Sequence, residues 1–142
     1  MESIKTSMDT IVSLMDDAFK EGMTFTFPSK GKSMLPLLHD NDLVTVDRIK
    51  TLKKGDIVLY KRNNGQYVLH RIRKIKKDKS FIMVGDHQRK VEYGIKESQI
   101  LAVLIAYKKN NKEYHLKGFR YSLYKLFIKS SIIRWFNSKL FK

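Results

Sequence analysis

Apolar side chains recur at intervals of three or four along the first twenty residues: Ile4, Met8, Ile11, Met15 and Phe19. Leu14 widens this stripe, and the acidic side chains between these positions lie off it. Such spacing predicts an amphipathic helix over residues 3–20 that ends near Gly22. We expect the stripe to pack on the core of the protein, which is the usual role of such a face.

From Met23 onward the period changes to alternation, which is typical of strands. Pro28 is expected to end the first strand, because proline cannot donate to a β-ladder. Asn63-Asn64-Gly65 and Asn110-Asn111 are predicted hairpin turns, since Asn and Gly tolerate positive φ. Further strands are predicted at residues 43–48, 56–62, 66–76, 80–84 and 99–108. The pattern therefore predicts a mainly β protein, with mostly antiparallel strands and short turns.

The last part of the chain, residues 116–142, has seven basic and no acidic side chains interleaved with aromatic and aliphatic ones. One or two basic helices are predicted here. Two interpretations stay open: helices that lie peripherally on an anionic membrane surface, or helices that pack on the sheet. The chain thus divides into an amphipathic helix (1–22), a β domain (23–115) and a basic segment (116–142).

Composition narrows the class of protein. The chain has 142 residues, of which 42% are hydrophobic, so it can bury the core of one domain. The absence of Cys excludes a disulfide scaffold, a Cys-based metal site and a Cys nucleophile. A net charge of +15 predicts attraction to polyanions or simply good solubility. We find no secretory signal and no apolar run near the roughly 20 residues of a spanning helix. The expected location is the cytoplasm or the periphery of the cytoplasmic membrane.

Three short segments hold residues with catalytic potential. Ser33 lies between Gly31 and Pro36, two residues that favour a tight, fixed turn. His70 shares the apolar face of its predicted strand with its neighbours two positions away, where a core histidine is also common. Asp86 follows a glycine after a strand, a pairing that is common in turns. Taken singly, none of the three identifies an active site.

Taken together and in this order, the segments resemble the signal peptidase I and LexA-type serine peptidase superfamily (S24/S26-like). The matching segments are Gly-Lys-Ser-Met-Leu-Pro, Lys-Gly-Asp-Ile-Val, Leu-His-Arg-Ile and Gly-Asp, at residues 31–36, 54–58, 69–72 and 85–86. The resemblance spans about residues 27–108. His70 and Arg71 fall where bacterial signal peptidases have Lys-Arg, so the chain is similar to the branch with a His base, the SipW-like and endoplasmic-reticulum type.

The resemblance implies a partly open, barrel-like sheet and a role for each matching residue. Ser33 corresponds to the nucleophile, His70 to the general base and Asp86 to the acid that orients the base. Gly31, Met34 and Pro36 would support the catalytic loop and the oxyanion site. A Ser hydroxyl needs such a base to become a nucleophile, and the Ser33 N–H is the natural oxyanion donor. Gly31 stands where many relatives have a Ser as second donor, so that donor is unassigned.

The implied activity is a serine endopeptidase that removes a leader or signal segment from a precursor polypeptide in extended conformation. No metal or cofactor is expected. Two features differ from the superfamily: the N-terminal helix is too polar to span a membrane, and one helix is too little for a helix-turn-helix domain. An autocleaving repressor is therefore not expected.

Four alternatives remain. The chain could be an inactive relative that binds peptides. It could be a basic β-barrel that binds single-stranded nucleic acid, although nucleic acid is not the partner we expect. His87 could replace His70 as base. A metal site could be built from His39, Asp40, Asp42, His70 and His87, although their spacing matches no known metal motif.

Overall fold

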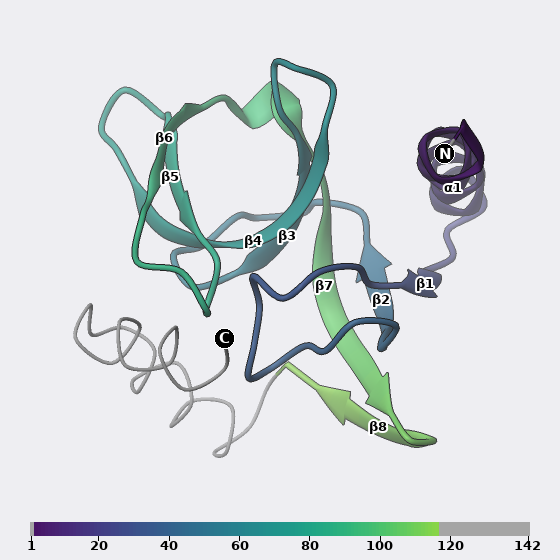
Figure 1. Cartoon of the computed structure of the whole chain (residues 1–142). Helices are drawn as coiled ribbons and strands as arrows, with labels where there is room; N and C mark the ends of the chain where they lie inside the picture. The colour runs from purple at the N-terminus through teal and green to yellow at the C-terminus, as the bar shows by residue number, and fades with distance from the viewer. Residues whose placement is uncertain (1, 117–142) are drawn as a thin grey trace.

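The described part of the chain is one antiparallel sheet with a helix on its flank (Figure 1). The computed structural model describes residues 2–116, with side chains described from Met8 onward. Within these residues there are eight strands and one α-helix, α1 (Glu2–Lys20). The prediction of a mainly β fold with an N-terminal helix is confirmed.

Helix α1 ends where the sequence predicts, and the cause is local. Gly22 has φ +75°, a left-handed conformation that glycine adopts without steric cost. The N–H of Gly22 donates to the carbonyl of Phe19 at 3.0 Å, and the N–H of Met23 donates to that of Ala18 at 2.9 Å. This is the Schellman pattern of helix termination. It turns the chain away from the helix axis into the first strand.

Six of the eight strands agree with the predicted segments, a seventh, β8 (Lys112–His115), follows the predicted hairpin turn at Asn110-Asn111, and β6 (Glu92–Ile95) is an addition. The six are β1 (Phe25–Pro28), β2 (Leu43–Asp47), β3 (Ile57–Lys61), β4 (Tyr67–Ile75), β5 (Phe81–Val84) and β7 (Ile100–Lys109). A short 3-10 helix, Glu97–Gln99, precedes β7. Strand β6 was not predicted, because it is four residues long and has a glycine of φ +73° at its third position.

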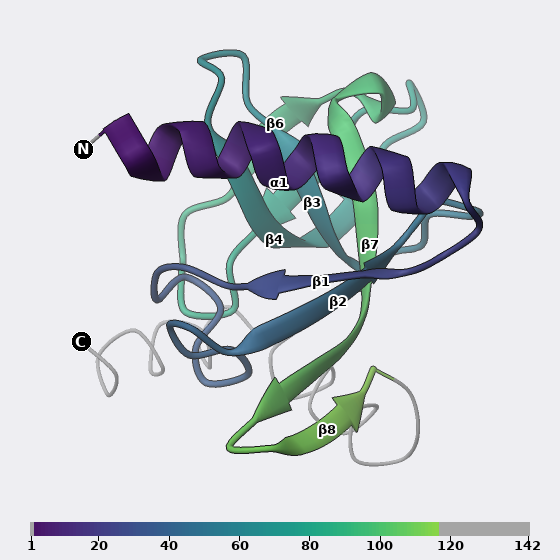
Figure 2. The same cartoon turned by 90° about the vertical axis from the view of Figure 1, so that its right-hand side faces the viewer.

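The sheet curls around the long strand β7. Its order is β1-β2-β7-β3-β4-β5-β6, with β8 paired to β7. The first part of β7 pairs with β3 and the later part with β2 and then β8. Figure 1 shows β3 to β6 curving into a half-barrel, and Figure 2 shows α1 crossing the molecule above β1. This is the partly open, barrel-like sheet that the resemblance implies.

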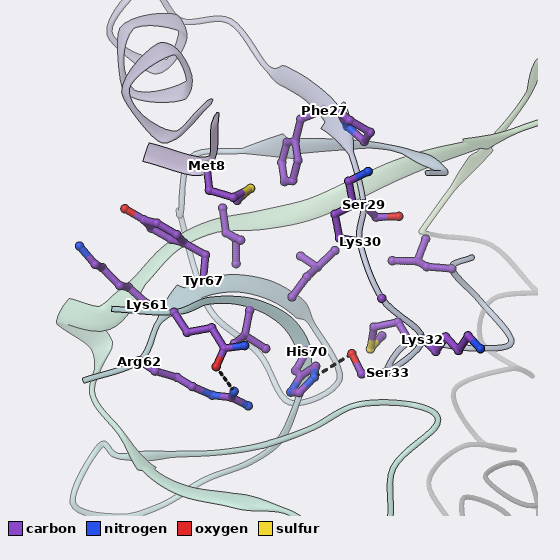
Figure 3. Close-up of a pocket in the computed structure, with 18 of the residues that line it drawn as sticks. Met8, Phe27, Ser29, Lys30, Lys32, Ser33, Lys61, Arg62, Tyr67 and His70 are labelled. Atoms are coloured by element: carbon purple, nitrogen blue, oxygen red, sulfur yellow. Dashed lines mark hydrogen bonds between the residues drawn. The ribbon is translucent and has the colours of Figure 1, made fainter. Parts of the chain in front are cut away.

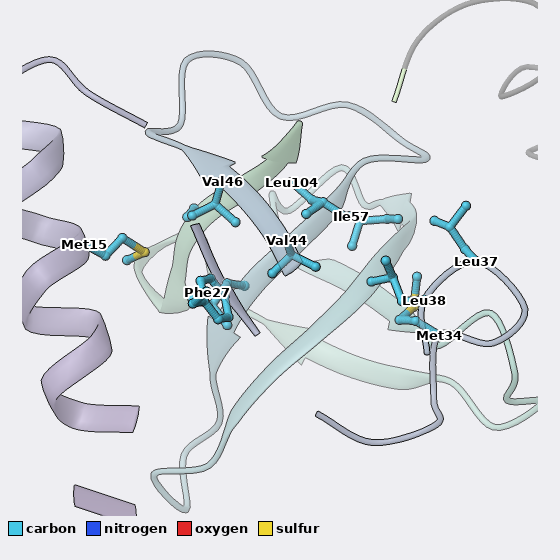
Figure 4. Packing of buried hydrophobic residues seen from close by; sticks show 11 residues of the cluster. Met15, Phe27, Met34, Leu37, Leu38, Val44, Val46, Ile57 and Leu104 are labelled. Atoms are coloured by element: carbon cyan, nitrogen blue, oxygen red, sulfur yellow. The ribbon is translucent and has the colours of Figure 1, made fainter. Parts of the chain in front are cut away.

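The core consists of two hydrophobic clusters. The first lies under α1 and contains Met15 together with residues of β2 and of the loop after β1 (Figure 4). The second lies inside the half-barrel and contains Val58, Tyr60 and Ile72. Alternate residues of β3 enter different clusters, as the two-residue period of a strand requires. Met15 is fully buried, so α1 is packed on the sheet through its predicted stripe.

Among the helices that the structure describes, none combines the length and the apolar character needed to cross a bilayer. The predicted basic helices and their membrane contact fall on residues 116–142, which lie outside the described residues apart from Leu116.

Candidate active site

Ser33 lies in the loop between β1 and β2, and this loop is closed by its own hydrogen bonds. The hydroxyl of Ser29 donates to the carbonyl of His39 at 3.0 Å, and the N–H of Gly31 donates to a carboxylate oxygen of Asp40 at 3.0 Å. Gly31 has φ +88°, so it provides the left-handed turn just before Ser33. The loop is thereby a fixed support for the hydroxyl.

The other side of the loop is anchored in the core. Met34, Leu37 and Leu38 are buried in the first hydrophobic cluster, whereas Ser33 is only half-buried. Pro36 follows Leu35 through a cis peptide bond and is half-buried. The residues around Ser33 therefore hold the turn, and Ser33 itself stays partly accessible.

The structure brings Ser33 and His70 together across 37 residues of sequence. The Nε2 atom of His70 lies 2.9 Å from the Oγ atom of Ser33, which is hydrogen-bonding distance (Figure 3). His70 is on β4, where alternation places it on the face of Val68 and Ile72, in the half-barrel cluster. An imidazole in contact with a Ser hydroxyl is the geometry of nucleophile activation.

A second loop fixes the backbone of Ser33. The N–H of His87 donates to the carbonyl of Ser33 at 2.8 Å. A Cβ atom added at Gly85 would lie 2.4 Å from the same carbonyl oxygen, so only glycine permits this approach. The backbone N–H of Asp86 also contacts the sulfur of Met34 at 3.4 Å. The Gly-Asp segment thus positions the nucleophile through the backbone.

Asp86, which the resemblance implies as the acid that orients the base, pairs with Arg71. Its two carboxylate oxygens accept hydrogen bonds from the guanidinium of Arg71, both at 2.7 Å, and the carboxylate is fully buried. Arg71 also donates to the carbonyl of Gly55 at 2.8 Å. Consecutive residues of β4 point to opposite faces, so the partner of Arg71 lies on the other side of the strand from His70. Burial lowers the pKa of His70, and the negative charge of Asp86 opposes this shift as a smaller effect.

Among the described residues, the second hydrogen-bond partner of His70 is Tyr60, which sequence reasoning missed. The Tyr60 hydroxyl lies 3.3 Å from Nδ1 of His70 and donates to Oε1 of Glu92 at 2.7 Å. Glu92 is on the unpredicted strand β6 and also accepts hydrogen bonds from Arg62. The sequence did carry one signal for the contact between Tyr60 and His70. Alternation in β3 places Tyr60 on the same face as Val58, and Val58 pairs with His70 on β4.

Burial determines the protonation of His70. The side chain is 4% exposed, and burial, followed by the charge of Arg62, lowers the pKa of His70 to about 4. His70 is therefore neutral at physiological pH, the state in which an imidazole can accept a proton.

Ser33 and His70 open into a groove of about 1150 Å³ that runs between the Ser33 loop and the first half of β4. Its apolar lining includes Phe27, Leu59 and Leu69. Helix α1 contributes Met8 and Asp9 at the end distant from the catalytic pair, as Figure 3 shows for Met8. The Tyr67 hydroxyl donates to Asp9 at 2.9 Å and joins this end of the groove to α1. Basic side chains also line the groove: Lys30, Lys32, Lys61 and Arg62.

The alternative sites do not assemble in the same way. Within residues 2–116, no group of three or more His, Asp or Glu side chains is arranged to hold a metal ion. His39 and Asp42 contact Lys109, while Asp40 accepts the hydrogen bond from Gly31. The ring of His87 lines the groove, but the imidazole on the Ser33 hydroxyl is that of His70.

Comparison with known proteins identifies the family of the chain. No curated protein matches the chain. The model of the Peptidase S24-like family matches residues 2–105, which include α1, the Ser33 loop, His70 and Asp86. The match covers most of the chain, and we conclude that this protein belongs to the Peptidase S24-like family.

Proposed function

We propose that the protein is a serine endopeptidase of the signal-peptidase-like type, which cleaves a leader or signal segment from a precursor polypeptide. Ser33 is the proposed nucleophile and His70 the proposed base, as in the His-base branch. The observation that carries the proposal is the 2.9 Å contact between the Ser33 hydroxyl and Nε2 of His70 at the side of a groove. Membership of a peptidase family supports the same reaction.

In the proposed reaction, Oγ of Ser33 attacks the carbonyl carbon of the scissile peptide while Nε2 of His70 takes the hydroxyl proton. The tetrahedral intermediate collapses when His70 gives that proton to the leaving nitrogen, which releases the C-terminal product as an amine. Water, deprotonated by His70, then hydrolyses the acyl-enzyme. Among the described residues the N–H of Ser33 donates to no protein acceptor, so this donor remains for the developing oxyanion.

The groove suits a substrate in extended conformation. Strand β1 is at one end of the sheet order and pairs with β2 alone among the described strands. On β4, pairing with β5 begins at Arg71, so the segment Tyr67–His70 has one edge toward the groove. Two such edges can receive main-chain hydrogen bonds from an added strand. Recognition by the backbone would place a peptide carbonyl beside Ser33.

The test is cleavage of a peptide library prepared from a whole proteome, followed by mass-spectrometric identification of new N-termini. We expect the full chain to produce new termini, and Ser33→Ala and His70→Gln to produce none while keeping the wild-type circular dichroism spectrum. Cleavage that persists in Ser33→Ala would refute the assignment. The intact mass of the purified protein, followed over the same time, reports any cleavage of the chain itself.

A catalytically inactive relative that binds peptides is the alternative, and the groove supports it equally. It predicts no new termini from the wild type, but retention of extended peptides by both wild type and Ser33→Ala. The two functions are therefore separated by the same library.

A further inference from the structure

The position of a proton on His70 can be read from the hydrogen bonds around it. For a neutral imidazole, one ring nitrogen donates and the other accepts, and only the form that accepts at Nε2 can take the proton of Ser33. The groups on the Nδ1 side therefore decide whether the pair is productive.

Glu92 determines the direction of the Tyr60 hydroxyl. Although partial burial opposes ionisation of Glu92, hydrogen bonds from Tyr60 and Arg62 lower its pKa, so it is a carboxylate and only accepts. Burial, followed by the hydrogen bond to Glu92, raises the pKa of Tyr60, so its hydroxyl keeps its single proton. That proton is donated to Glu92 at 2.7 Å. Toward His70, 3.3 Å away, the Tyr60 oxygen can then only accept.

We propose that Tyr60, oriented by Glu92, is a positioning residue that fixes His70 with its proton on Nδ1 and leaves Nε2 as the acceptor for Ser33. This inference rests on the proposed function, because the fixed tautomer matters for a base. It gives Tyr60 the role that the resemblance implies for Asp86, whose carboxylate pairs with Arg71.

Water would be a poor substitute for Tyr60. A cavity of about 480 Å³ lined by Arg62, His70 and Glu92 lies beside this network, so water can approach when the hydroxyl is removed. A water molecule both donates and accepts, and it would allow either tautomer of His70. Tyr60 itself is fully buried and does not line the groove, so its hydroxyl acts on the base and not on substrate binding.

The direct test is nuclear magnetic resonance of the full chain labelled with ¹⁵N in its four histidines, with His70→Gln used to assign the His70 signals. At neutral pH we expect a pyrrole-type nitrogen at Nδ1 and a pyridine-type nitrogen at Nε2. Tyr60→Phe keeps the buried ring and should give a mixture of tautomers. Glu92→Gln is the second variant, and it should shift the tautomer in the same direction even where Tyr60→Phe folds poorly.

Kinetics on a peptide from the library supply the second readout. Tyr60→Phe should lower kcat roughly 10- to 100-fold with KM unchanged, the range expected for one lost buried hydrogen bond. Tyr114→Phe removes a hydroxyl from β8, where the ring stacks on Tyr107, and is the matched control with an expected change below about twofold.

The outcomes separate the two proposals. An unchanged tautomer and an unchanged kcat in Tyr60→Phe overturn the role of Tyr60 and leave the peptidase standing. A tautomer that depends on Tyr60 in a protein that cuts nothing supports the positioning network and removes the proposed function. An Nε2-protonated His70 in the wild type overturns this inference directly.

Discussion

Arg71 and Asp86 form a buried ion pair with two hydrogen bonds of 2.7 Å, on the opposite side of β4 from His70. The pair joins β4 to the loop that carries Gly85 and His87, and this loop contacts the backbone of Ser33. We therefore expect Asp86 to affect the site by holding this loop in place.

Asp86→Asn should destabilise the fold, because Arg71 would keep a buried charge without its carboxylate. The expected loss is about 3–5 kcal/mol of unfolding free energy, measured by urea denaturation. Glu97→Gln, at an exposed carboxylate, is the control and should leave the midpoint unchanged. A variant that keeps its stability but loses kcat would instead assign Asp86 to the base.

The low pKa of His70 predicts an unusual acid limit for activity. Because only the neutral imidazole accepts a proton, kcat/KM should be constant from about pH 5.5 upward and should halve near pH 4. An exposed histidine would give the half-maximal rate near its ordinary pKa of about 6.5. A pH–rate profile with a midpoint at that higher value would contradict the burial argument.

The same shift predicts how stability depends on pH. The pKa of His70 is lower in the folded chain than in the unfolded one, so between about pH 6.5 and 4 the unfolded chain binds more protons. The contribution of His70 to the unfolding free energy is therefore complete above about pH 6.5 and is lost as the pH falls toward 4. Denaturation of wild type and His70→Gln across this range should show a steeper loss for the wild type.

Gly85→Ala should separate positioning of the nucleophile from stability. Its Cβ would lie 2.4 Å from the Ser33 carbonyl oxygen, so the Ser33 loop must move. We expect at least a tenfold loss of kcat and a destabilisation of roughly 1–3 kcal/mol. Gly22→Ala, at the end of α1, costs about 1 kcal/mol because of its positive φ but lies away from the site, so the folded fraction should keep its activity. Equal activities of the two variants, per folded molecule, would disprove this role of Gly85.

Met15→Ala tests whether α1 is an integral part of the β fold. Met15 is fully buried, whereas the adjacent Leu14 is 52% exposed. Truncation of Met15 should cost roughly 2–5 kcal/mol, and truncation of Leu14 less than about 0.5 kcal/mol. Similar thermal unfolding midpoints for both variants would show that α1 contributes little to the core.

The sequence was sufficient to predict the helix, most strands and the pairing of Ser33 with His70. Hydrophobic period and turn residues are local signals, and the order of the short segments indicated the family. The partners of His70 could not be predicted in this way. They depend on which strands lie side by side, and Glu92 comes from β6, a short strand with weak alternation. The pairing of Asp86 with Arg71 could not be predicted either, because the sequence does not tell which face of β4 the loop of Asp86 approaches.

The two hydrophobic clusters have a consequence for how folding and activity are linked. Ser33 is supported by residues of one cluster, and His70 lies on the face of the other. A small shift of the part of the sheet around one cluster relative to the part around the other would separate the Ser33 hydroxyl from the His70 imidazole, while each cluster kept its own packing. Peptide hydrolysis should therefore be lost at lower denaturant concentrations than the far-ultraviolet circular dichroism signal of the strands. The rate of turnover would then report loss of the native structure earlier than the spectrum does.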